Sequence, residues 1–320
     1  MILILGSSGY VGKKFQWALR NKGLNYMAVS RGSFDYYQRG VLDSLIEAYR
    51  PSMIINTAGF TGKPNVEACE HQRDETTLGN VVLPVAIAEA CVRHGVIMGH
   101  ISSGCIYDSP TQEFSEDDAP NFCFKTPNHS FYSGTKAQSE ELLKDIPGLK
   151  AYIWRLRIPF DQYASPRNYI TKMLTYPKLV SVPNSLSHLG DFTKSCVDCF
   201  TRGVEFGTYN MTNPGSMTAE QFTEMWCKIH GPKKFSFWPS VEEFNKHTTT
   251  PRSNCVLNTD KATKAGVGMR HIRDAMNDAI LLYGMTEDST DLSGVVHTAI
   301  GCGQHKGCGF TGQNNCTLCG

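Results

Sequence analysis

A strand-like apolar run leads directly into three evenly spaced glycines at the start of the chain, in the stretch ILILGSSGYVGKKFQWAL. Gly6, Gly9 and Gly12 stand between this run and a segment of helical periodicity. Glycines at such a junction allow a tight turn and let the backbone approach a pyrophosphate, which then rests on the N-terminal end of the helix. The stretch therefore predicts a dinucleotide site, with a ligand-free glycine-rich turn as the alternative.

The segments that follow predict a parallel sheet covered by helices. Short β-rich runs occur at residues 2–5, 26–30, 53–58, 96–102 and 151–157, with helical segments such as VLDSLIEAYR and VVLPVAIAEACVRHG between them. This alternation is typical of α/β folds. We expect a Rossmann-type doubly wound parallel sheet over residues 1–160. A smaller α/β substrate lobe, partly interleaved with the sheet, is expected over residues 161–284, on the carboxyl edge where such folds bind ligands.

Composition argues against several classes of protein. The net charge of the 320 residues is +1, so neither nucleic acid nor a membrane surface is an expected partner. No apolar run approaches the roughly 20 residues of a membrane span, and MILIL is too short for a signal-peptide core. The twelve cysteines are scattered through a large chain, which favours free thiols over a disulfide framework. We therefore expect a cytoplasmic protein.

The last residues, 285–320, differ in composition from the rest of the chain. They are rich in glycine and contain Cys302, Cys308, Cys316 and Cys319, with His305 among them. These are enough ligands for tetrahedral zinc, but their spacing matches no common zinc module. We predict a disordered extension without a metal, with zinc or a redox pair as alternatives. Cys196 and Cys199 also form a C-x-x-C pair, in a helical segment where burial is the simpler explanation.

The end of the second predicted strand bears on the choice of cofactor. An NAD-binding protein usually has an acidic residue there, whereas this chain has Ser30 and Arg31. A guanidinium suits a 2′-phosphate, so NADP(H) is favoured over NAD(H). The alternative is that Arg31 only lies in solvent at the end of the strand. The other predicted cofactor contacts are Tyr10 and Val11 in the glycine loop, and Ala58 and Gly59 after the third strand.

A tyrosine and a lysine at Y-x-x-x-K spacing are the candidate catalytic pair. Tyr132 and Lys136 lie four residues apart in a helical segment, which places both on one face. A nearby ammonium lowers the pKa of a phenol, so the phenol exchanges a proton with a carbonyl or alcohol oxygen while hydride moves. Ser103, at the end of the fourth strand, offers a second hydroxyl to the same oxygen. Lys136 is also predicted to contact the cofactor.

With these residues in place, the chain resembles the extended short-chain dehydrogenase/reductases, within the sugar-nucleotide branch that includes dTDP-4-dehydrorhamnose reductase and GDP-fucose synthase. It is most similar to the bifunctional UDP-4-keto-6-deoxyglucose 3,5-epimerase/4-reductases of UDP-rhamnose synthesis. The matching stretches, which lie in order between residue 1 and about 283, are NTAGFTGKPNVEACE (56–70), SSGCIYD (102–108), EDDAPNF (116–122), FYSGTKAQSEELL (131–143), LRIPFDQYASPRNYITKM (156–173), VPNS (182–185), YNMTNPG (209–215) and PRSN (251–254).

The resemblance implies roles for further residues. Cys105 occupies the place of an epimerisation base, and Lys172 that of the acid on the opposite face of the sugar. Arg252 matches an arginine that neutralises the diphosphate of a nucleotide sugar, and Asn65 and Asn168 are weaker candidates for sugar contacts. The implied substrate is a nucleotide-linked 4-keto sugar, UDP-linked by the closest match, and a homodimer is the default assembly.

Two other functions stay open on the sequence. One is a reductase alone, of the dTDP-4-dehydrorhamnose reductase kind, in which Cys105 is a small buried hydrophobe. The other is a regulatory or binding protein without activity, because a fold does not imply a function. Ser103, Tyr132 and Lys136 argue against the second alternative.

Overall fold

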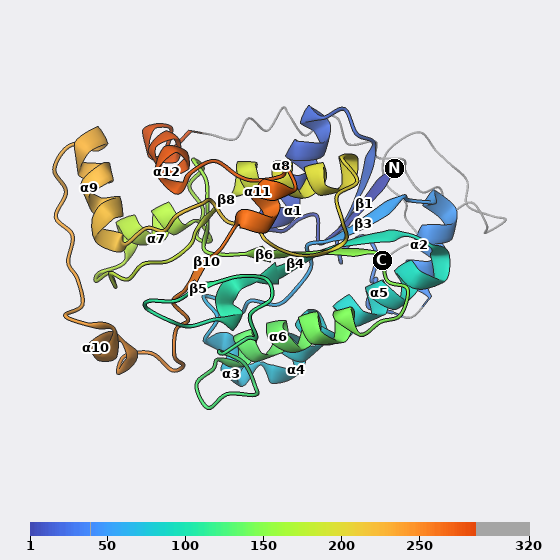
Figure 1. Ribbon diagram of the computed structural model, residues 1–320, viewed down its shortest axis with the longest axis horizontal. Coiled ribbons are helices and arrows are strands. Elements are labelled where there is room, and N and C mark those ends of the chain that lie inside the picture. The colour runs from blue at the N-terminus through green and yellow to red at the C-terminus, as the bar shows by residue number, and fades with distance from the viewer. Residues whose placement is uncertain (39, 286–320) are drawn as a thin grey trace, which may run out of the picture. The chain divides into compact units, whose positions relative to one another are not determined.

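The computed structural model describes residues 1–38 and 40–285. Six strands in this part of the chain form one parallel sheet, in the order β2-β1-β3-β4-β6-β9 (Figure 1). They are β1 (Ile2–Leu5), β2 (Tyr26–Val29), β3 (Met53–Asn56), β4 (Ile97–Ser103), β6 (Ala151–Leu156) and β9 (Gly207–Asn210). The predicted Rossmann-type sheet is confirmed, and β9 is an added strand that the sequence did not predict.

The central strands are apolar because both faces of the sheet are covered. All four residues of β1 are buried, and Ile4 pairs with Ala28 of β2 on one side and with Ile55 of β3 on the other. The chain crosses from one side of β1 to the other between β2 and β3. This reversal of strand order marks the carboxyl edge near β1 as the place where a doubly wound sheet binds its ligand.

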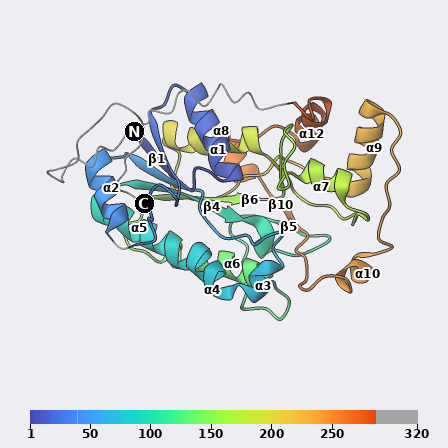
Figure 2. The ribbon, with the colours of Figure 1, turned by 180° about the vertical axis from the view of Figure 1, so that it is seen from behind.

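Helices pack against both faces of the sheet (Figures 1 and 2). One face is covered by α1 (Tyr10–Asn21), α8 (Leu189–Thr201) and α11 (Asp260–Lys264), and the other by α2 (Val41–Tyr49), α5 (Leu83–His94) and α6 (Phe131–Lys144). Side chains of one strand alternate between the two faces: Ile2 and Ile4 join the first core, and Leu3 and Leu5 the second.

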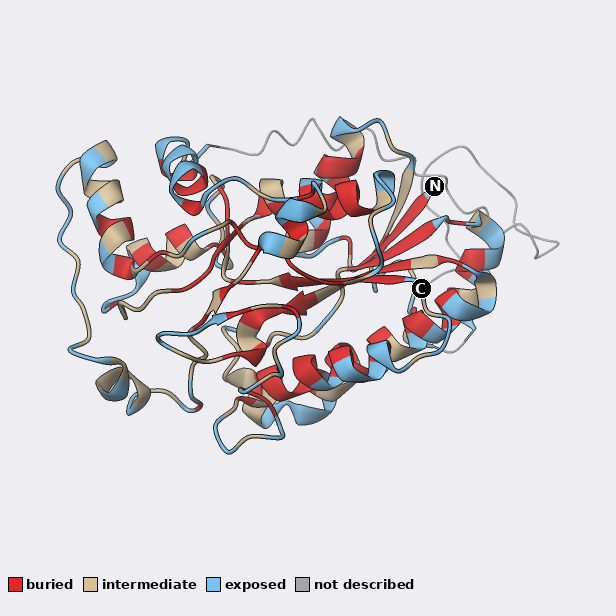
Figure 3. Cartoon of the chain, viewed as in Figure 1, coloured by how far each residue is buried: buried red, intermediate tan, exposed pale blue. Residues whose placement is uncertain are grey.

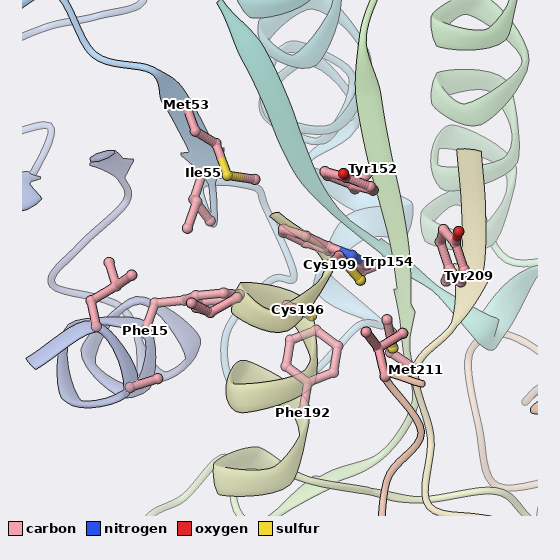
Figure 4. Packing of buried hydrophobic residues seen from close by; sticks show 14 of the residues in the cluster. Phe15, Met53, Ile55, Tyr152, Trp154, Phe192, Cys196, Cys199, Tyr209 and Met211 are labelled. Carbon is pink, nitrogen blue, oxygen red and sulfur yellow. The ribbon is translucent and has the colours of Figure 1, made fainter. Parts of the chain in front are cut away.

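The first core explains one of the two C-x-x-C pairs. Cys196 and Cys199 of α8 are fully buried and pack with Trp154 of β6 and Phe192 (Figure 4). The interpretation of these cysteines as buried core residues is confirmed. Because α8 also packs against α1, this helix covers the six-stranded sheet rather than the smaller lobe to which the sequence assigned it. The pair of Cys316 and Cys319, with its predicted zinc and redox alternatives, lies outside the described residues.

A third core lies beyond the carboxyl edge of the sheet. It contains residues from α7 (Tyr169–Thr175), α9 (Ala219–His230) and α12 (Ile272–Leu281). Two further two-stranded sheets pair β5 (Glu113–Phe114) with β10 (Val256–Leu257), and β7 (Pro159–Phe160) with β8 (Ser187–His188). The remaining elements are α3 (Ala68–His71), α4 (Arg73–Thr77), the π-helical η1 (Leu78–Val82), the 3-10 helix η2 (Gly104–Ile106) and α10 (Val241–Asn245).

The continuous helical stretch Arg73–His94 is long and apolar enough, by length and composition, to cross a membrane. Within its most apolar window 56% is buried inside the protein, as in the core helix of a soluble protein, which passes the same test. Figure 3 shows that α5 turns a buried side toward the sheet and an exposed side away from it. This pattern favours a core helix.

Candidate active site

The predicted site residues converge because most of them follow a parallel strand at its carboxyl end. Gly6 follows β1, Ser30 follows β2 and Ala58 follows β3, while Ser103 is the last residue of β4. Parallel strands present these ends at one edge of the sheet. The elements are thus arranged as a cofactor-binding edge requires.

The glycine loop fits a dinucleotide phosphate. Gly6 has φ +79°, and a Cβ on it would lie 2.6 Å from the backbone nitrogen of Ala58. A Cβ on Gly12 would lie 2.4 Å from the carbonyl oxygen of Gly6. Helix α1 begins after Gly9 without any side-chain cap, so its first N–H groups remain for an anion. The loop and the start of α1, including Tyr10 and Val11, would hold the pyrophosphate of NADP(H).

A cavity of about 300 Å³ lies beside this loop. Its lining comes from the loop and α1 on one side, and from the segment after β7 on the other: Ser8, Tyr10, Lys13, Lys14, Asp161, Tyr163, Ala164 and Ser165. The Tyr10 hydroxyl donates to Asp161 at 3.2 Å, and the Lys14 ammonium lies 3.3 Å from the same carboxylate. These contacts tie the glycine loop to residues 161–165.

Ser30 and Arg31 lie in a turn directly after β2. The Ser30 hydroxyl lies 2.8 Å from that of Ser33, and the exposed Arg31 guanidinium lies 5.7 Å from the centre of the Tyr37 ring. No carboxylate forms an ion pair with Arg31 in the described part of the chain. The geometry leaves this charge available to a phosphate, and the preference for NADP(H) stays a prediction.

Tyr132 and Lys136 lie in the first turns of α6, as their spacing predicted. The helix begins with a capping box, in which the side chains of Ser130 and Ser133 each bond the backbone N–H of the other residue. Both Tyr132 and Lys136 are buried, and the Lys136 ammonium donates to the carbonyl oxygen of Ile101 in β4 at 3.0 Å. This contact fixes α6 against the strand that ends in Ser103.

The electrostatics of this pair differ from the prediction that the ammonium lowers the pKa of the phenol. Burial raises the pKa of Tyr132 above its ordinary value, the Cys105 sulfur raises it further, and the Ser103 hydroxyl opposes both. Burial lowers the pKa of Lys136 to about 8, although Glu140 and Cys105 oppose this shift. Tyr132 is therefore protonated at neutral pH, which suits a proton donor.

Cys105 lies in the 3-10 turn η2 that follows β4. Its backbone N–H donates to the Ser103 side-chain oxygen at 3.1 Å, and Arg157 donates from Nη1 to its sulfur at 2.9 Å. The residue is partly exposed, unlike the buried Cys69, Cys91, Cys123 and Cys255. Cys105 thus contacts a cation and is partly exposed.

Lys172 lies in the last turn of α7. Burial lowers the pKa of Lys172, the charges of Arg167 and Arg252 lower it further, and the Cys105 sulfur opposes them. These influences show that the predicted base, the predicted acid and the predicted diphosphate ligand share one region. In the described part of the chain the Lys172 ammonium has no hydrogen-bond or ion-pair partner, and a lowered pKa makes it a better acid near neutral pH.

Arg252 is paired with a carboxylate in this structure. Its Nη2 donates to the Glu67 side chain at 2.8 Å, and the backbone N–H of Thr249 donates to the same oxygen at 3.3 Å. Both partners are partly exposed. A diphosphate that binds Arg252 would therefore compete with Glu67.

The two asparagines predicted as sugar contacts have structural partners. The fully buried Asn168 caps α7 through a bond to Ile170 N–H, and its amide donates to the carbonyl oxygens of Asp161 and Tyr163 at 2.7 Å each. Asn65 accepts a bond from the backbone of Glu67 at 2.8 Å. Both side chains organise loops, which favours the alternative that they do not bind sugar.

Two arginines that the sequence did not predict also contact the site. Arg167 donates to the Thr61 side chain and to the Gly62 carbonyl oxygen, which ties the loop before α7 to the loop after β3. Arg157 contacts Cys105. A signal for both was available in hindsight, because each lies within the stretch LRIPFDQYASPRNYITKM that carries the family resemblance.

With this geometry described, known proteins can be compared. The model of the RmlD substrate binding domain family matches residues 1–284. The chain belongs to the RmlD family. This membership confirms the predicted place in the sugar-nucleotide branch of the extended short-chain dehydrogenase/reductases, among nucleotide-4-keto-6-deoxyhexose epimerases and reductases.

Two plant relatives of this RmlD-type chain are 33% identical to it. One is the trifunctional UDP-glucose 4,6-dehydratase/UDP-4-keto-6-deoxy-D-glucose 3,5-epimerase/UDP-4-keto-L-rhamnose-reductase RHM1 of Arabidopsis thaliana, matched over 86% of this chain and 40% of the relative. The chain thus spans about two fifths of RHM1. The other is the bifunctional dTDP-4-dehydrorhamnose 3,5-epimerase/dTDP-4-dehydrorhamnose reductase of the same plant, matched over 81% of this chain and 85% of the relative.

Solved structures show the same fold. The L780 UDP-rhamnose synthase of Acanthamoeba polyphaga mimivirus has a TM-score of 0.80 at 24% identity, over 88% of this chain and 98% of that chain. The dTDP-4-dehydrorhamnose reductase of Bacillus anthracis, solved in complex with NADP, has a TM-score of 0.73 at 17% identity, over 88% and 97% of the two chains. The RmlD-type fold predicted from the sequence is confirmed.

Proposed function

We propose that this protein catalyses the NADPH-dependent 3,5-epimerisation and 4-keto reduction of a nucleotide-4-keto-6-deoxyhexose, with UDP-4-keto-6-deoxyglucose as substrate and UDP-L-rhamnose as product. The observation that carries the proposal is the grouping of Cys105 and Lys172 with the reductase residues Ser103 and Tyr132. A reductase alone needs neither Cys105 nor Lys172.

Epimerisation follows from the acidity of the hydrogens beside a ketone. In the ionised form, the Cys105 sulfur removes the proton from carbon 3 or carbon 5, and the electron pair of that C–H bond moves to the carbonyl oxygen as an enolate. Ser103 and Tyr132 donate hydrogen bonds to this oxygen. The Lys172 ammonium then returns a proton to the opposite face of the same carbon, which inverts it.

Reduction uses the same hydrogen bonds from Ser103 and Tyr132 to the carbonyl oxygen of the sugar. The glycine loop and Arg31 would hold NADPH, which would supply the hydride for carbon 4. Tyr132, protonated because its pKa is raised, gives its proton to the carbonyl oxygen. Lys136, charged below its pKa of about 8, would contact the cofactor from the same helix. One pose of the sugar serves both reactions.

The choice of UDP rests on the relatives. The name of RHM1 and that of the mimivirus synthase both specify UDP-linked sugars, whereas the bifunctional plant relative is named for dTDP-linked ones. UDP is therefore the first substrate to test, and dTDP the second. The eight described cysteines are all free thiols, which supports our further proposal that the protein works in the cytoplasm.

The test is incubation of the full chain with UDP-4-keto-6-deoxyglucose and NADPH in deuterium oxide, with the product identified by NMR. The proposal predicts UDP-L-rhamnose that carries deuterium at carbons 3 and 5. A product reduced at carbon 4 without deuterium at these carbons would leave a reductase alone. No turnover with UDP-linked or dTDP-linked substrates would favour a regulatory or binding protein.

A further inference from the structure

Arg157 is the residue that touches the predicted epimerisation base. It follows β6 at the carboxyl edge of the sheet, is 3% exposed, and places Nη1 at 2.9 Å from the Cys105 sulfur. The family resemblance assigned no role to it, and the reaction steps above do not use it.

Neutral groups hold the second terminal nitrogen of the guanidinium, whereas the buried Nε has no hydrogen-bond partner in the described part of the chain. Its Nη2 donates to the Asn184 side-chain oxygen at 2.6 Å and to the Ser253 carbonyl oxygen at 2.5 Å. The backbone N–H of Arg157 donates to the Ser187 hydroxyl at 3.1 Å, which fixes the start of the side chain as well. Contacts with three segments that are remote in sequence thus fix the orientation of the guanidinium, with Nη1 directed at the Cys105 sulfur.

The turn that carries Cys105 approaches Arg157 closely because Gly104 has no side chain. Gly104 precedes the cysteine, and a Cβ on it would lie 2.7 Å from Leu257 and 3.3 Å from the Arg157 side chain. The Gly104 carbonyl oxygen in turn accepts a bond from the Cys255 thiol at 3.2 Å. A side chain at position 104 would push η2 away from the guanidinium.

The charge of Arg157 acts on three ionisable groups, Cys105, Cys255 and Asp108, and its guanidinium hydrogen-bonds Cys105 among them. Among the described residues its guanidinium bonds an amide oxygen, a backbone carbonyl and the Cys105 sulfur, and it forms no ion pair with a carboxylate. A guanidinium is charged at every pH of interest, and a cation beside a sulfur favours the thiolate over the thiol. The hydrogen bond from Nη1 makes Cys105 the ionisable group that this guanidinium contacts directly. The other titratable groups that act on the sulfur are Tyr132, Lys136, Lys172 and Cys255.

We infer that Arg157 is the positioning residue of the epimerase half of the site: it holds the Cys105 sulfur toward the substrate and stabilises its ionised form. This inference rests on the proposed function, in which Cys105 is the base. The competing explanation is that Arg157 has only a structural role. It would then join three segments and lie next to the sulfur without affecting the ionisation of the thiol.

The test measures the reactivity of the Cys105 thiol across pH and does not depend on turnover of a substrate. In the full chain, alkylation of Cys105 by iodoacetamide is followed across pH by peptide mass spectrometry, for the parent and for Arg157→Gln, Arg157→Met and Arg157→Lys, with Arg202→Gln as a control on an exposed arginine. We expect the midpoint of alkylation to rise by about one pH unit or more in the Gln and Met variants, less in the Lys variant, and not in the control. An unchanged midpoint in a folded Gln or Met variant overturns the inference.

Folding of each variant is checked by circular dichroism and NADPH binding. The Met variant replaces a buried charge by an apolar side chain of similar length, which proteins often tolerate. If both uncharged variants fail to fold, the Lys variant decides, because its shorter reach is expected to raise the midpoint in the same direction. No rise in the Lys variant then overturns the inference.

Isotope exchange separates this inference from the proposed function. Arg157→Gln is expected to slow deuterium exchange at carbons 3 and 5 by about tenfold or more at pH 7, while reduction of an already epimerised substrate changes by less than about threefold. Exchange that persists in Cys105→Ser would refute the proposed base and leave the alkylation result intact. Exchange lost in Cys105→Ser but unchanged in Arg157→Gln would refute the role of Arg157 alone.

Discussion

The backbone N–H of Cys105 donates to the side-chain oxygen of Ser103 at 3.1 Å, so the thiol and the hydroxyl are held on one turn. This turn, η2, directly continues β4, whose backbone accepts the bond from Lys136. The hydroxyl predicted to bind the ketone oxygen and the sulfur predicted to remove a neighbouring proton therefore move as one unit. Such a turn lets a single bound sugar contact both the Ser103 hydroxyl, which serves reduction, and the Cys105 sulfur, which serves epimerisation.

Replacement of Arg31 tests the cofactor preference. Arg31→Ala is expected to raise KM for NADPH by about tenfold or more, because a charge-assisted hydrogen bond contributes about 1.5–3 kcal/mol, with KM for NADH nearly unchanged. Steady-state kinetics with both cofactors measures this, and Arg93→Ala, an exposed arginine paired with Asp43, is the control. An equal loss with both cofactors would contradict a contact to the 2′-phosphate.

Arg252 is predicted to bind the diphosphate of the substrate in exchange for Glu67. Arg252→Met should raise KM for the nucleotide sugar by about ten- to a hundredfold with little change in kcat, the pattern of a group that binds substrate and transition state equally. Kinetics of the reduction step measures both constants. Arg202→Met, which removes an arginine bonded to Gly266, should leave them unchanged; a fall in kcat alone in Arg252→Met would contradict the assignment.

The lowered pKa of Lys136 predicts the pH dependence of reduction. The ammonium loses its proton as the pH rises through about 8, whereas Tyr132 stays protonated because its pKa is raised. We expect kcat/KM for reduction of an already epimerised substrate to fall above about pH 8. A profile that stays flat up to about pH 10 would contradict this role.

The lowered pKa of Lys136 also affects how the free energy of unfolding depends on pH. Lys136 binds its proton less tightly in the folded chain, at a pKa of about 8, than at its ordinary value of 10.5. The unfolded chain therefore holds more protons on this group between these two values, and its contribution to the free energy of unfolding rises with pH across that window. Denaturant unfolding of the parent and Lys136→Met, at pH 7 and pH 10, measures the difference in slope; equal slopes would contradict the shift.

Neighbouring glutamates of α6 offer a matched test of what holds the catalytic helix. Glu140 is buried against Arg155 of β6, with an N···O distance of 2.8 Å, while Glu141 is exposed and pairs with Lys125. Glu140→Gln should lower the free energy of unfolding by about 3–5 kcal/mol, because it leaves a buried guanidinium without its counter-charge. Glu141→Gln should have no measurable effect. Similar denaturation midpoints for the two variants would contradict this account.

The strands and the cofactor loop were predictable because their signals are local. An apolar run such as ILIL, buried on both faces, and the glycines that follow it are visible within a dozen residues. Strand β9 was not predicted, since the four residues GTYN are short and largely polar and become a strand only by pairing with β6.

The partners within the site were less predictable, because they are contacts between remote residues. Arg157 meets its three partners across 52, 27 and 96 positions of the chain, and a lone arginine carries no pattern that foretells them. The pairing of Arg252 with Glu67 and the loop-organising roles of Asn65 and Asn168 needed coordinates for the same reason. The direction of the Tyr132 pKa shift depended on burial, which spacing along a helix does not specify.

The central claim is that Cys105 is the base of the epimerisation, and deuterium exchange in Cys105→Ser tests it most directly. With UDP-4-keto-6-deoxyglucose in deuterium oxide, the account predicts that NMR detects exchange at carbons 3 and 5 with the parent and with Cys227→Ser, a control on another partly exposed thiol. It predicts no exchange with Cys105→Ser, which should still reduce an already epimerised substrate. Parent-level exchange in Cys105→Ser would contradict the claim.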